Sequence, residues 1–457
     1  MVVEAWLARA AAAAPGATAI ETPAGSWSYA ELHAAARAGA GELAARGAGP
    51  GELVAIALPA GLAFAQALHA CMLLGAVAVP VDLRLSAAER ERVASGSTVT
   101  VHEPLTGGEG LAGGAEGLRD DARLPGASAG TAAGHDLDAV AAVIHTSGTT
   151  SAPRPVELTY GNLLWSALGS AVALGLDPRE RWLCALPVSH VGGLSILVRS
   201  SIYATSAVVH ERFEADRVLH ALRTREITLV SLVATTLDRL LEEGLRSPPS
   251  LRCTLTGGGP VPGALLQRAH AAGVPVSLTY GLTESCSQVT TTPVAEIGSA
   301  RTSAGPPLFC TTVRIAPDEE ILVRGPTVAP GAPAADGWLH TGDLGSLDDA
   351  ARLRVTGRKA DTIVSGGENV APAEVEAVLE AHEGVREAAV LGRPDERWGE
   401  AVTAIVVARA GAELDAEQLR EHCRRTLAPF KVPKRFVLAA EPLPRTRSGK
   451  LLRRELR

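Results

Sequence analysis

Short apolar runs alternate with longer stretches of helical periodicity along most of the chain. Strands are predicted over residues 52–58 and 76–79, and helices over residues 28–45 and 63–74. A further apolar run at residues 141–144 has the length and composition of a buried strand. Such alternation is typical of βα units, in which helices cover a parallel sheet. We therefore expect an α/β fold in which parallel βα-type sheets form a large N-terminal part.

The hydrophobic pattern changes twice in the second half of the chain. Strand and helix signals alternate through residues 207–232, and short strands with Gly/Pro turns follow between Ser299 and Leu353. These short strands predict a small β-barrel-like part. A mixed α+β unit is expected after Gly357. Its predicted elements are helices at residues 372–381 and 415–426 and strands at residues 387–391 and 401–407.

The length of the chain requires more than one domain. A single hydrophobic core stops growing at about 250 to 300 residues, and this chain has 457. We place the boundary near Arg358–Asp361, which divides the chain into domains of residues 1–357 and 358–457. Residues 94–137 are rich in Gly, Ala, Ser and Thr and have few large apolar side chains, so they are expected to be a loosely ordered connection.

Charge and cysteine usage narrow the class of function. The formal net charge is −7 and Lys and Arg form no stripe, which argues against nucleic acid as the main partner. The six cysteines are dispersed without CxxC spacing and no HExxH occurs, so neither a disulfide framework nor a zinc site is predicted. A run of about 18 uncharged apolar residues and a basic leader are both missing. We expect a cytoplasmic protein without a membrane span that acts on small molecules.

The first candidate for chemistry is the turn that follows the predicted strand at residues 141–144. It contains, in order, Thr146, Ser147, Gly148, Thr149 and Thr150. The backbone N–H groups and short hydroxyls of such a turn can converge on phosphate oxygens, because glycine leaves no Cβ in the way. By itself the same composition also suits an ordinary solvated loop. The P-loop pattern GxxxxGK[ST] is absent, so a phosphate site here requires a different ATP-binding fold.

Seven segments together resemble the adenylate-forming superfamily of acyl- and aryl-CoA ligases, peptide-synthetase adenylation domains and luciferases. They cover nearly the whole chain in the family's order. The segments are TSGTTSAPRPV (146–156), LPVSHVGG (186–193), GGGP (257–260), TYGLTE (279–284), GWLHTGDLG (337–345), GRKADTIVSGGENVAPAEVE (357–376) and LPRTRSGKLLRR (443–454). The resemblance implies an ATP-dependent acid–CoA ligase that works through an acyl-adenylate. It also implies Mg²⁺ and coenzyme A as cofactor and co-substrate, and a C-terminal domain that is mobile.

The resemblance also implies which residues contact ATP. They are Thr146, Ser147, Gly148, Thr149, Thr150, Arg154, Gly257, Gly258, Gly259, Thr279, Tyr280, Gly281, Thr283, Asp343, Arg358 and Lys450. Tyr280 is expected to stack on adenine, Asp343 to accept hydrogen bonds from the ribose hydroxyls, and Arg358 to add a ribose or phosphate contact. Glu284 and Thr146 are expected at the magnesium ion, which takes oxygen ligands and keeps several waters.

Catalysis is expected from Lys450, His190, Thr146 and Glu284. A carboxylate must attack the α-phosphate of ATP, and the repulsion between two anions is the main obstacle. The ammonium group of Lys450 would bridge both anions, while His190 would orient or gate the acid and thiol paths. Without the resemblance, Lys450 is better described as a solvated lysine in a basic tail, and a buried core histidine stays an alternative for His190.

The resemblance also suggests the second step and the acid. Ser365, Gly366 and Gly367 resemble the loop that lines the CoA channel after the C-terminal domain rotates. The segments around His190 and Glu284 are most similar to those of the o-succinylbenzoate-CoA ligase family of menaquinone biosynthesis. The expected substrate contacts are His190, Arg199, Gly281 and Ser285. Arg199 would bind the carboxylate of the acid that is not activated. A surface arginine, or one that only packs between helices, is an equally good interpretation of this residue.

Two other functions stay open. One is a ligase for another aryl, fatty or natural-product acid. The other is a catalytically weakened nucleotide-binding regulatory protein, because Ser151, Arg154 and Pro155 stand where relatives carry glycine and a Lys-Gly pair. Pro155 lacks an N–H and stiffens the loop, and Ala360 stands where relatives often carry Asp or Lys at the hinge. The presence of the catalytic lysine and both site carboxylates favours an active enzyme, with a homodimer considered as its assembly.

Overall fold

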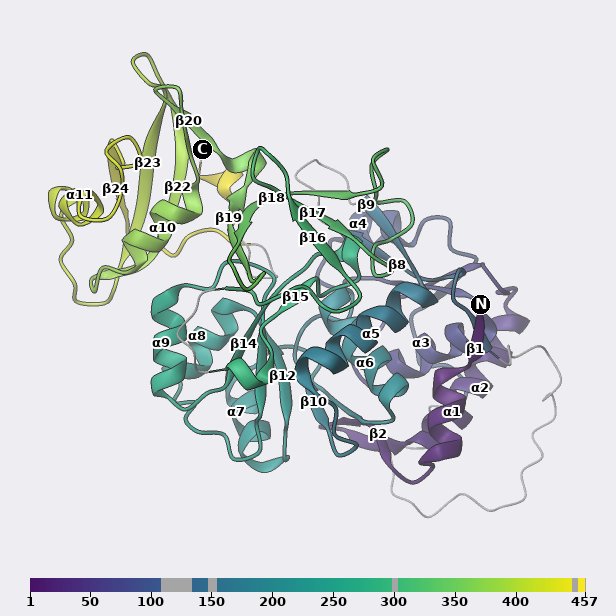
Figure 1. Ribbon diagram of the computed structural model, residues 1–457. Helices are drawn as coiled ribbons and strands as arrows, with labels where there is room; N and C mark the ends of the chain where they lie inside the picture. The colour runs from purple at the N-terminus through teal and green to yellow at the C-terminus, as the bar shows by residue number, and fades with distance from the viewer. Residues whose placement is uncertain (108–133, 147–153, 298–302, 446–450, 457) are drawn as a thin grey trace.

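The largest sheet of the molecule has eight strands. The computed structural model describes residues 1–107, 134–146, 154–297, 303–445 and 451–456 (Figure 1). The strands of this sheet are β2 (Thr18–Thr22), β3 (Gly25–Ser28), β10 (Arg181–Cys184), β11 (Ser206–Val209), β12 (Leu229–Leu232), β13 (Cys253–Thr256), β14 (Val276–Tyr280) and β15 (Thr290–Thr291). Their order is β15-β14-β13-β12-β10-β11-β2-β3. The pairs from β14 to β2 are parallel, and β15 and β3 pair antiparallel at the two edges.

A second sheet has five strands. They are β4 (Leu53–Ile56), β5 (Val77–Pro80), β6 (Val99–Val101), β8 (Val140–Thr146) and β9 (Arg154–Thr159). Their order is β6-β4-β5-β8-β9, in which only the last pair is antiparallel. A separate two-stranded pair joins β1 (Val2–Glu4) to β7 (Gly134–Asp136). The parallel βα-type sheets expected from the sequence are confirmed.

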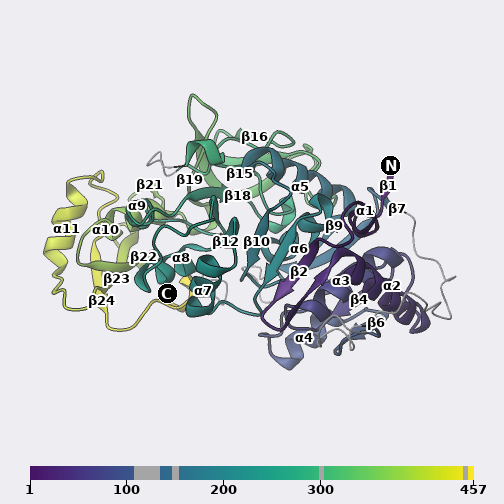
Figure 2. The same ribbon diagram turned by 90° about the horizontal axis from the view of Figure 1, so that it is seen from below.

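Helices form three layers around these two sheets. They are α1 (Trp6–Ala13), α2 (Tyr29–Ala45), α3 (Leu62–Leu74), α4 (Ala87–Ala94), α5 (Tyr160–Leu174), α6 (Val191–Tyr203), α7 (Ala215–Thr224), α8 (Ala234–Glu242) and α9 (Gly263–Ala271). The core between the sheets contains α2, α3, α5 and α6, whereas α7 to α9 pack on the far face of the large sheet. The far face of the smaller sheet is covered by α4 (Figures 1 and 2).

Successive residues of a strand enter different cores. Val54 and Ile56 face the helices between the sheets, and Ala55 faces the side of α4. In the same way, Trp182 packs in the core between the two sheets and Leu183 packs in the core formed with α7 to α9. This period of two is the geometry of a strand. Because both faces are covered, the strands are apolar throughout, which explains why they are continuous apolar runs in the sequence.

A third sheet follows, made of β16 (Thr312–Ile315), β17 (Glu320–Arg324), β18 (Leu339–Leu347) and β19 (Leu353–Arg358). All its pairs are antiparallel. The part expected to be barrel-like is instead an open sheet, with β16 and β19 at its two edges. The edge of β19 cannot close on β16 because Leu353 exchanges backbone hydrogen bonds with Ala304 and Gly305 (2.8 and 2.9 Å). The sheet is thereby joined to the segment that follows β15.

The C-terminal unit lies at one end of the molecule, next to β19 (Figure 1). Its elements are β20 (Ile363–Ser365), β21 (Glu368–Val370), α10 (Pro372–Glu380), β22 (Val385–Asp395), β23 (Gly399–Ala408), α11 (Ala416–Arg424) and β24 (Arg435–Ala439). The strand order is β21-β20-β23-β22, and β24 pairs with β23. The small α+β domain is confirmed, while the boundary between residues 357 and 358 stays a prediction.

Local sequence signals explain where several elements begin. The helix α2 starts at Tyr29 because the Ser28 hydroxyl accepts the Glu31 N–H (3.3 Å) and the Glu31 carboxylate accepts the Ser28 N–H (2.7 Å). The expected loose connection at residues 94–137 is wrong at its ends, because β6 and β7 are ordered strands there. Val99 and Val101 are buried against β4 and supply the apolar contacts of β6. Residues 108–133 lie outside the described residues.

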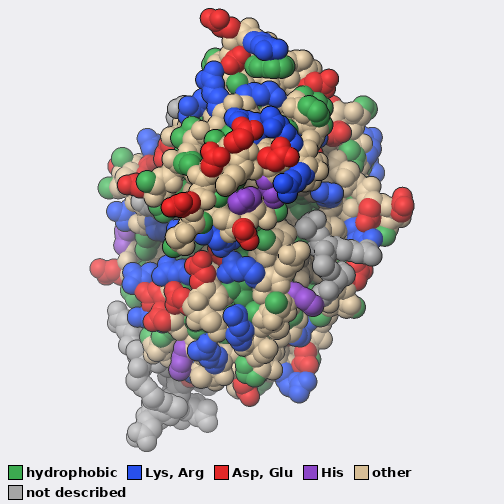
Figure 3. Space-filling model, turned by 90° about the vertical axis from the view of Figure 1, so that its left-hand side faces the viewer, with side chains coloured by type: hydrophobic (Ala, Val, Ile, Leu, Met, Phe, Trp, Pro, Cys, Tyr) green, Lys and Arg blue, Asp and Glu red, His purple; other side chains and the backbone are tan. Residues whose placement is uncertain are grey.

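The charged side chains on the surface of the described residues are mixed in sign, as the sequence suggested. On the face shown in Figure 3, Lys and Arg side chains are interspersed with Asp and Glu and form no single-sign stripe. All six cysteines are free, and five of them are buried. Within the described ranges, no helix combines the length and apolar composition that crossing a bilayer requires.

A polar cluster fixes the end of the chain to the C-terminal unit. Val390 lies on the edge strand β22, where its N–H donates to Oε1 of Glu376 (2.7 Å) and its carbonyl accepts Nη1 of Arg453 (2.7 Å). Arg453 also binds both carboxylate oxygens of Glu376 (2.5 and 2.8 Å). The two side chains are 19% and 11% exposed. Two mostly buried side chains of opposite charge therefore bind the backbone N–H and carbonyl of Val390, which have no strand partner at this edge of the sheet.

Glu376→Gln should destabilise the C-terminal unit by about 3 kcal/mol, because it removes the bidentate partner of the mostly buried Arg453 and leaves that charge only the longer contact with Asp361 (3.5 Å). Denaturant unfolding monitored by hydrogen exchange in β22 and β23 measures this. The matched control is Arg454→Met, which removes an exposed arginine from the same turn and should change the free energy of unfolding by less than about 0.5 kcal/mol. Equal effects of the two variants would contradict the stabilising role of the pair.

Candidate nucleotide- and acid-binding site

The residues predicted to bind substrates follow the carboxyl ends of parallel strands. Gly257 follows β13, Gly281 follows β14, and His190 lies after β10 in the loop before α6. The carboxyl ends of parallel strands lie on one side of a sheet, where ligands of α/β proteins bind. The fold therefore brings together segments that are up to about ninety residues apart in the sequence.

Asp343 is the best-defined polar group of this region. Its Oδ1 accepts the Nε of Arg358 at 2.7 Å, and its Oδ2 accepts the Tyr280 hydroxyl at 2.9 Å. Asp343 is 6% exposed, whereas the Arg358 side chain is 51% exposed. Burial, followed by the charge of Asp343, raises the pKa of Tyr280 far above its ordinary value, so the phenol stays protonated and donates. Three residues predicted at the nucleotide are thus in direct contact.

Close backbone packing shapes the turns beside Tyr280. A Cβ on Gly257 would lie 2.7 Å from both Cγ2 and the carbonyl oxygen of Thr279, and a Cβ on Gly281 would lie 1.6 Å from the carbonyl oxygen of Ser287. Only glycine fits at these two positions. Gly258 has a φ of +78°, which also favours glycine, and Gly259 is open on the side where a Cβ would point. Contacts within the protein therefore account for the glycines at 257 and 281, and the adenine contact at this turn stays a prediction.

The residues after Gly281 form a short 3-10 turn, Thr283–Ser285. The hydroxyl of Ser285 donates to the Leu282 carbonyl (3.0 Å) and accepts the Leu282 N–H (3.1 Å), and Ser285 is fully buried. Contact of Ser285 with the substrate therefore stays a prediction. The Glu284 carbonyl accepts the Ala329 N–H at 2.8 Å, while no hydrogen bond or ion pair within the described residues engages the Glu284 carboxylate. A carboxylate without a protein partner suits an oxygen ligand of Mg²⁺.

The predicted phosphate loop lies in the sequence between β8 and β9, which pair antiparallel. Thr146 pairs with Arg154 across these two strands, and its hydroxyl donates to the Arg154 carbonyl at 3.3 Å. Ser147, Gly148, Thr149 and Thr150 lie outside the described residues, as does Lys450. Within the described ranges, no cluster of three or more His, Cys, Asp or Glu could hold a metal ion. A magnesium ion on ATP would need only one or two oxygen ligands from the protein, because the phosphates and water supply the others.

His190 contacts two residues that the sequence analysis missed. Asp82 and Arg84 follow β5 of the smaller sheet, and Arg84 binds Asp82 through Nε (2.8 Å) and Nη2 (2.6 Å). Nη2 of Arg84 also lies 3.2 Å from Nε2 of His190. A guanidinium can only donate, so this contact requires an unprotonated Nε2. A charged pair directly after a predicted strand was the signal that could have identified this contact.

Arg199 is the most buried arginine near the predicted acid site. It is 2% exposed, its Nη2 donates to the Ser166 hydroxyl at 2.9 Å, and the guanidinium lies 5.6 Å from the Trp182 ring centroid. Its Nε has no partner and no carboxylate pairs with it among the described residues. The Ser166 hydroxyl in turn donates to the Cys286 carbonyl at 2.6 Å. The inter-helix alternative is thus correct for its location, but the charge itself is uncompensated.

Ser365, Gly366 and Gly367 lie at a tight hairpin turn in the C-terminal unit. Ser365 pairs with Glu368, and the two glycines between them have φ values of +62° and +85°. Two central residues with positive φ form a type I′ turn, which explains the glycine pair. The Gly366 N–H donates to the Trp398 carbonyl at 2.8 Å, and a Cβ on Gly366 would lie 2.9 Å from the Trp398 ring. The turn therefore lies directly on Trp398.

Two cations surround Trp398, and sequence reasoning found neither them nor the ring. The Arg397 guanidinium lies 4.9 Å and the Lys434 ammonium 5.1 Å from the ring centroid. Burial lowers the pKa of Lys434. Lys434 follows the strand β23 by more than twenty residues, so only the parallel pairing of β24 with β23 brings it here. An aromatic ring with two cations beside the glycine turn is suited to an anionic, nucleotide-containing ligand.

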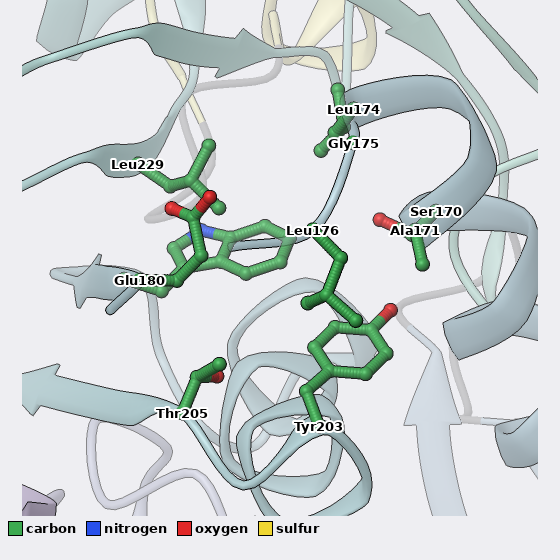
Figure 4. Close-up of a pocket in the computed structure, with 10 residues that line it drawn as sticks. Ser170, Ala171, Leu174, Gly175, Leu176, Glu180, Tyr203, Thr205 and Leu229 are labelled. Atoms are coloured by element: carbon green, nitrogen blue, oxygen red, sulfur yellow. The ribbon is translucent and has the colours of Figure 1, made fainter. Parts of the chain in front are cut away.

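A small cavity at the other end of the large sheet is not part of this site. It is lined by residues that include Ser170, Glu180, Tyr203 and Thr205 (Figure 4). Glu180 and Thr205 precede β10 and β11, so the cavity lies at the amino ends of the strands. Its volume is about 10 Å³, which is at the lower limit for one water molecule.

The chain matches known protein families along most of its length. Residues 7–331 match the AMP-binding enzyme family, and residues 374–450 match the AMP-binding enzyme C-terminal domain. A curated 2-succinylbenzoate–CoA ligase of Bacillus subtilis (strain 168) is 38% identical over 485 residues, which cover 99% of this chain and 97% of that protein.

Solved structures extend the similarity to the arrangement of the whole chain. O-succinylbenzoate CoA synthetase of Bacillus subtilis in complex with the acyl-adenylate intermediate is 37% identical, with a TM-score of 0.87 over 100% of this chain and 98% of that chain. Its complex with ATP and magnesium ion has a TM-score of 0.86, at 37% identity over 100% of both chains. A double mutant of the same synthetase, bound to its product analogue, has a TM-score of 0.71 at 37% identity, over 100% of this chain and 99% of that chain. The chain belongs to the AMP-binding enzyme family and, within it, to the family of 2-succinylbenzoate–CoA ligases.

Proposed function

We propose that this protein is an AMP-forming acid–CoA ligase that acts on 2-succinylbenzoate. In the first step one carboxylate of the acid attacks the α-phosphate of ATP, the bond to the β-phosphate oxygen breaks, and diphosphate leaves. In the second step the CoA thiol attacks the acyl carbon, loses its proton, and AMP leaves. The observation that carries this proposal is the full-length similarity to a structure that holds the acyl-adenylate, together with the Asp343–Tyr280–Arg358 contact.

The nucleotide is proposed to bind through Asp343. Each carboxylate oxygen has one protein donor and therefore keeps a free lone pair for a ribose hydroxyl. Arg358 is half-exposed and can reach a second ribose or phosphate oxygen. Adenine would lie against Tyr280 and the glycine turn that follows β13, where Gly259 is open on the side to which a Cβ would point.

Magnesium is proposed to be held by the ATP phosphates together with Glu284 and Thr146. When bound, it would neutralise charge on the phosphates and so favour the departure of diphosphate. The protein supplies the Glu284 carboxylate, which has no other partner among the described residues, and the Thr146 hydroxyl at the end of β8. Arg154, at the start of β9, is exposed and adds a positive charge beside the loop.

The two steps are proposed to use the C-terminal unit in two orientations. Lys450 supplies the charge that brings together two anions in the first step. The higher TM-score against the acyl-adenylate complex than against the product-analogue complex supports the adenylating orientation for the structure described. In the second orientation, Ser365, Gly366 and Gly367 would line the thiol path, with Arg397, Lys434 and Trp398 available for the charged end of CoA.

Arg199 is proposed to recognise the carboxylate that is not activated. A buried guanidinium without a carboxylate partner is costly to keep, and 2-succinylbenzoate would supply the missing charge. His190, held beside Arg84 and Asp82, stands at the start of the helix that carries Arg199. Gly281 and the turn containing Ser285 would form the opposite wall, which Ser166 joins to Arg199 through the Cys286 carbonyl.

The proposal is tested by 2-succinylbenzoate-dependent ATP–diphosphate exchange followed by detection of the CoA thioester. Lys450→Ala should lower the rate of adenylate formation by about 10² to 10⁴ while ATP binding changes little, because a transition-state charge contact is lost. Preformed acyl-adenylate should still yield thioester. Equal losses in both steps would contradict the role of Lys450, and nucleotide binding without any exchange across a panel of acids would favour the regulatory alternative.

Arg199→Met should raise the KM for 2-succinylbenzoate about 10- to 100-fold, because a hydrogen-bonded ion pair is worth about 1.5–3 kcal/mol. The control substrate is 4-oxo-4-phenylbutanoate, which lacks the ring carboxylate. Its KM should hardly change in the variant. The same loss for both acids would show that Arg199 only supports the packing of α5 and α6.

We also propose a homodimer in the cytoplasm. Free cysteines are typical of a reducing compartment. The α5 apolar face, made of Leu168, Val172, Leu176 and Phe309, is 37% to 68% exposed. Leu168 and Val172 are four residues apart on α5, Leu176 lies just beyond the end of this helix, and Phe309 lies beside Trp165 of α5 (6.3 Å between ring centroids). Contiguous exposed apolar side chains of this kind mark protein interfaces.

Val172→Glu should convert the dimer to a monomer in light scattering, because it places a charge in the centre of the α5 apolar face. The matched control is Leu438→Glu, at a side chain that is 50% exposed on β24 of the C-terminal unit, and it should leave the mass unchanged. A wild-type protein that stays monomeric at high micromolar concentration would contradict this assembly.

A further inference from the structure

Asp343 lies in a bulge of β18. Across the β17–β18 pair, Leu344 is opposite Glu320 and His340 is opposite Leu322. The three residues 341–343 therefore face the single residue Ile321. A bulge re-aims a side chain, but it also removes the ladder partners of its backbone N–H groups. Asp343 can point away from the sheet toward Tyr280 and Arg358 only if these N–H groups find other acceptors.

The acceptors come from two side chains. The Asp343 N–H donates to the Thr341 hydroxyl at 3.1 Å, and the Gly342 N–H donates to Oε1 of Glu320 at 2.9 Å. Gly342 has a φ of +68°, which a residue with a side chain adopts only at a cost. The conformation of the residue directly before Asp343 thus depends on one carboxylate.

The same carboxylate also holds the residue directly after Arg358. Oε2 of Glu320 accepts Nζ of Lys359 at 3.2 Å and lies 3.4 Å from Nδ1 of His340. The Glu320 side chain is 8% exposed. Burial alone would raise the pKa of Glu320, but the hydrogen bonds from Gly342, Lys359 and His340 outweigh it and lower the pKa, so the group is ionised. Glu320 therefore touches a chain neighbour of each member of the Asp343–Arg358 ion pair.

We propose that Glu320 is a positioning residue for recognition of the nucleotide ribose. By holding Gly342 on one strand and Lys359 on the next, it keeps Asp343 and Arg358 in register and aimed at the ribose hydroxyls. Glu320 itself touches neither the nucleotide nor the reacting atoms. The inference rests on the proposed function, in which Asp343 binds the ribose, and it adds a residue that lies outside the seven segments shared with the superfamily.

The test compares kcat/KM for ATP, 2′-deoxy-ATP and 3′-deoxy-ATP in the 2-succinylbenzoate-dependent reaction. The wild-type protein should prefer ATP, because a site built to hydrogen-bond a hydroxyl rejects an analogue without it. Glu320→Ala should lower kcat/KM for ATP about 10- to 100-fold and that for the deoxynucleotides much less, so the preference collapses. Glu320→Gln keeps an acceptor for the Gly342 N–H and should retain an intermediate preference.

The matched control is Asp318→Asn. Asp318 also binds Nζ of Lys359 (2.7 Å), but it is 52% exposed and does not contact Gly342. This variant should keep the wild-type preference for ATP. A loss of kcat/KM in Glu320→Ala that is equal for all three nucleotides, accompanied by a lower melting temperature, would show a purely structural role and overturn the inference.

Asp343→Ala separates this inference from the proposed function. If Asp343→Ala abolishes the preference and Glu320→Ala does not, the inference about Glu320 fails and ribose binding by Asp343 stands. If Asp343→Ala keeps the full preference, ribose binding by Asp343 fails and the inference falls with it. Loss of preference in both variants, with Asp318→Asn unchanged, is the result that the geometry predicts.

Discussion

The ion pair between Asp343 and Arg358 connects the nucleotide site to the C-terminal unit. Asp343 belongs to the bulge of β18, and Arg358 is the last residue of β19, so the pair closes the end of the third sheet. Tyr280, at the end of β14, adds the large sheet to the same contact. The next residues, Lys359–Asp361, form the short turn that leads into the C-terminal unit. A ligand bound to Asp343 would therefore also affect the segment about which we propose that this unit rotates.

Some charged side chains of the site are bound by other protein groups, whereas others have no partner of opposite charge among the described residues. Asp343 is held by two donors even without a ligand, which fixes its direction in advance. Within the part of the chain that the structure describes, the buried Arg199 has no carboxylate partner and its Nε has no hydrogen bond, and the Glu284 carboxylate has no protein partner either. In the proposed reaction the missing partners are the second carboxylate of the acid and the magnesium ion. The arrangement thus stabilises the bound state more than the free protein.

Much of the fold, and the residues that the structure brings together at the candidate site, could be predicted from the sequence because the signals are local. Apolar runs locate strands that are buried on both faces, and a Ser-x-x-Glu pattern locates the start of α2. Glycines at positions 257 and 281 follow strands directly, and the structure shows that no other residue fits there. The barrel-like part was predicted incorrectly because closure of a sheet depends on which segment reaches its edge, and strand lengths do not reveal this.

The residues that were missed act through contacts between distant segments. Arg84 meets His190 across 106 positions, and Lys434 reaches Trp398 only because β24 pairs with β23. Glu320 carries no motif, and its role depends on the register of β17 against a bulge. Single-sequence patterns report periodicity and turn chemistry but not the pairing of strands far apart in the chain. The boundary between residues 357 and 358 and the individual site roles remain predictions for the same reason.

The central claim is that one site forms an acyl-adenylate from 2-succinylbenzoate and then passes the acyl group to CoA. Rapid quenching of a single turnover, with mass spectrometry of the products, tests it most directly. Without CoA, one equivalent of 2-succinylbenzoyl-adenylate and of diphosphate should accumulate on the enzyme. Adding CoA should convert the adenylate to equal amounts of 2-succinylbenzoyl-CoA and AMP. Release of ADP, or thioester formation without a preceding adenylate, would contradict the account.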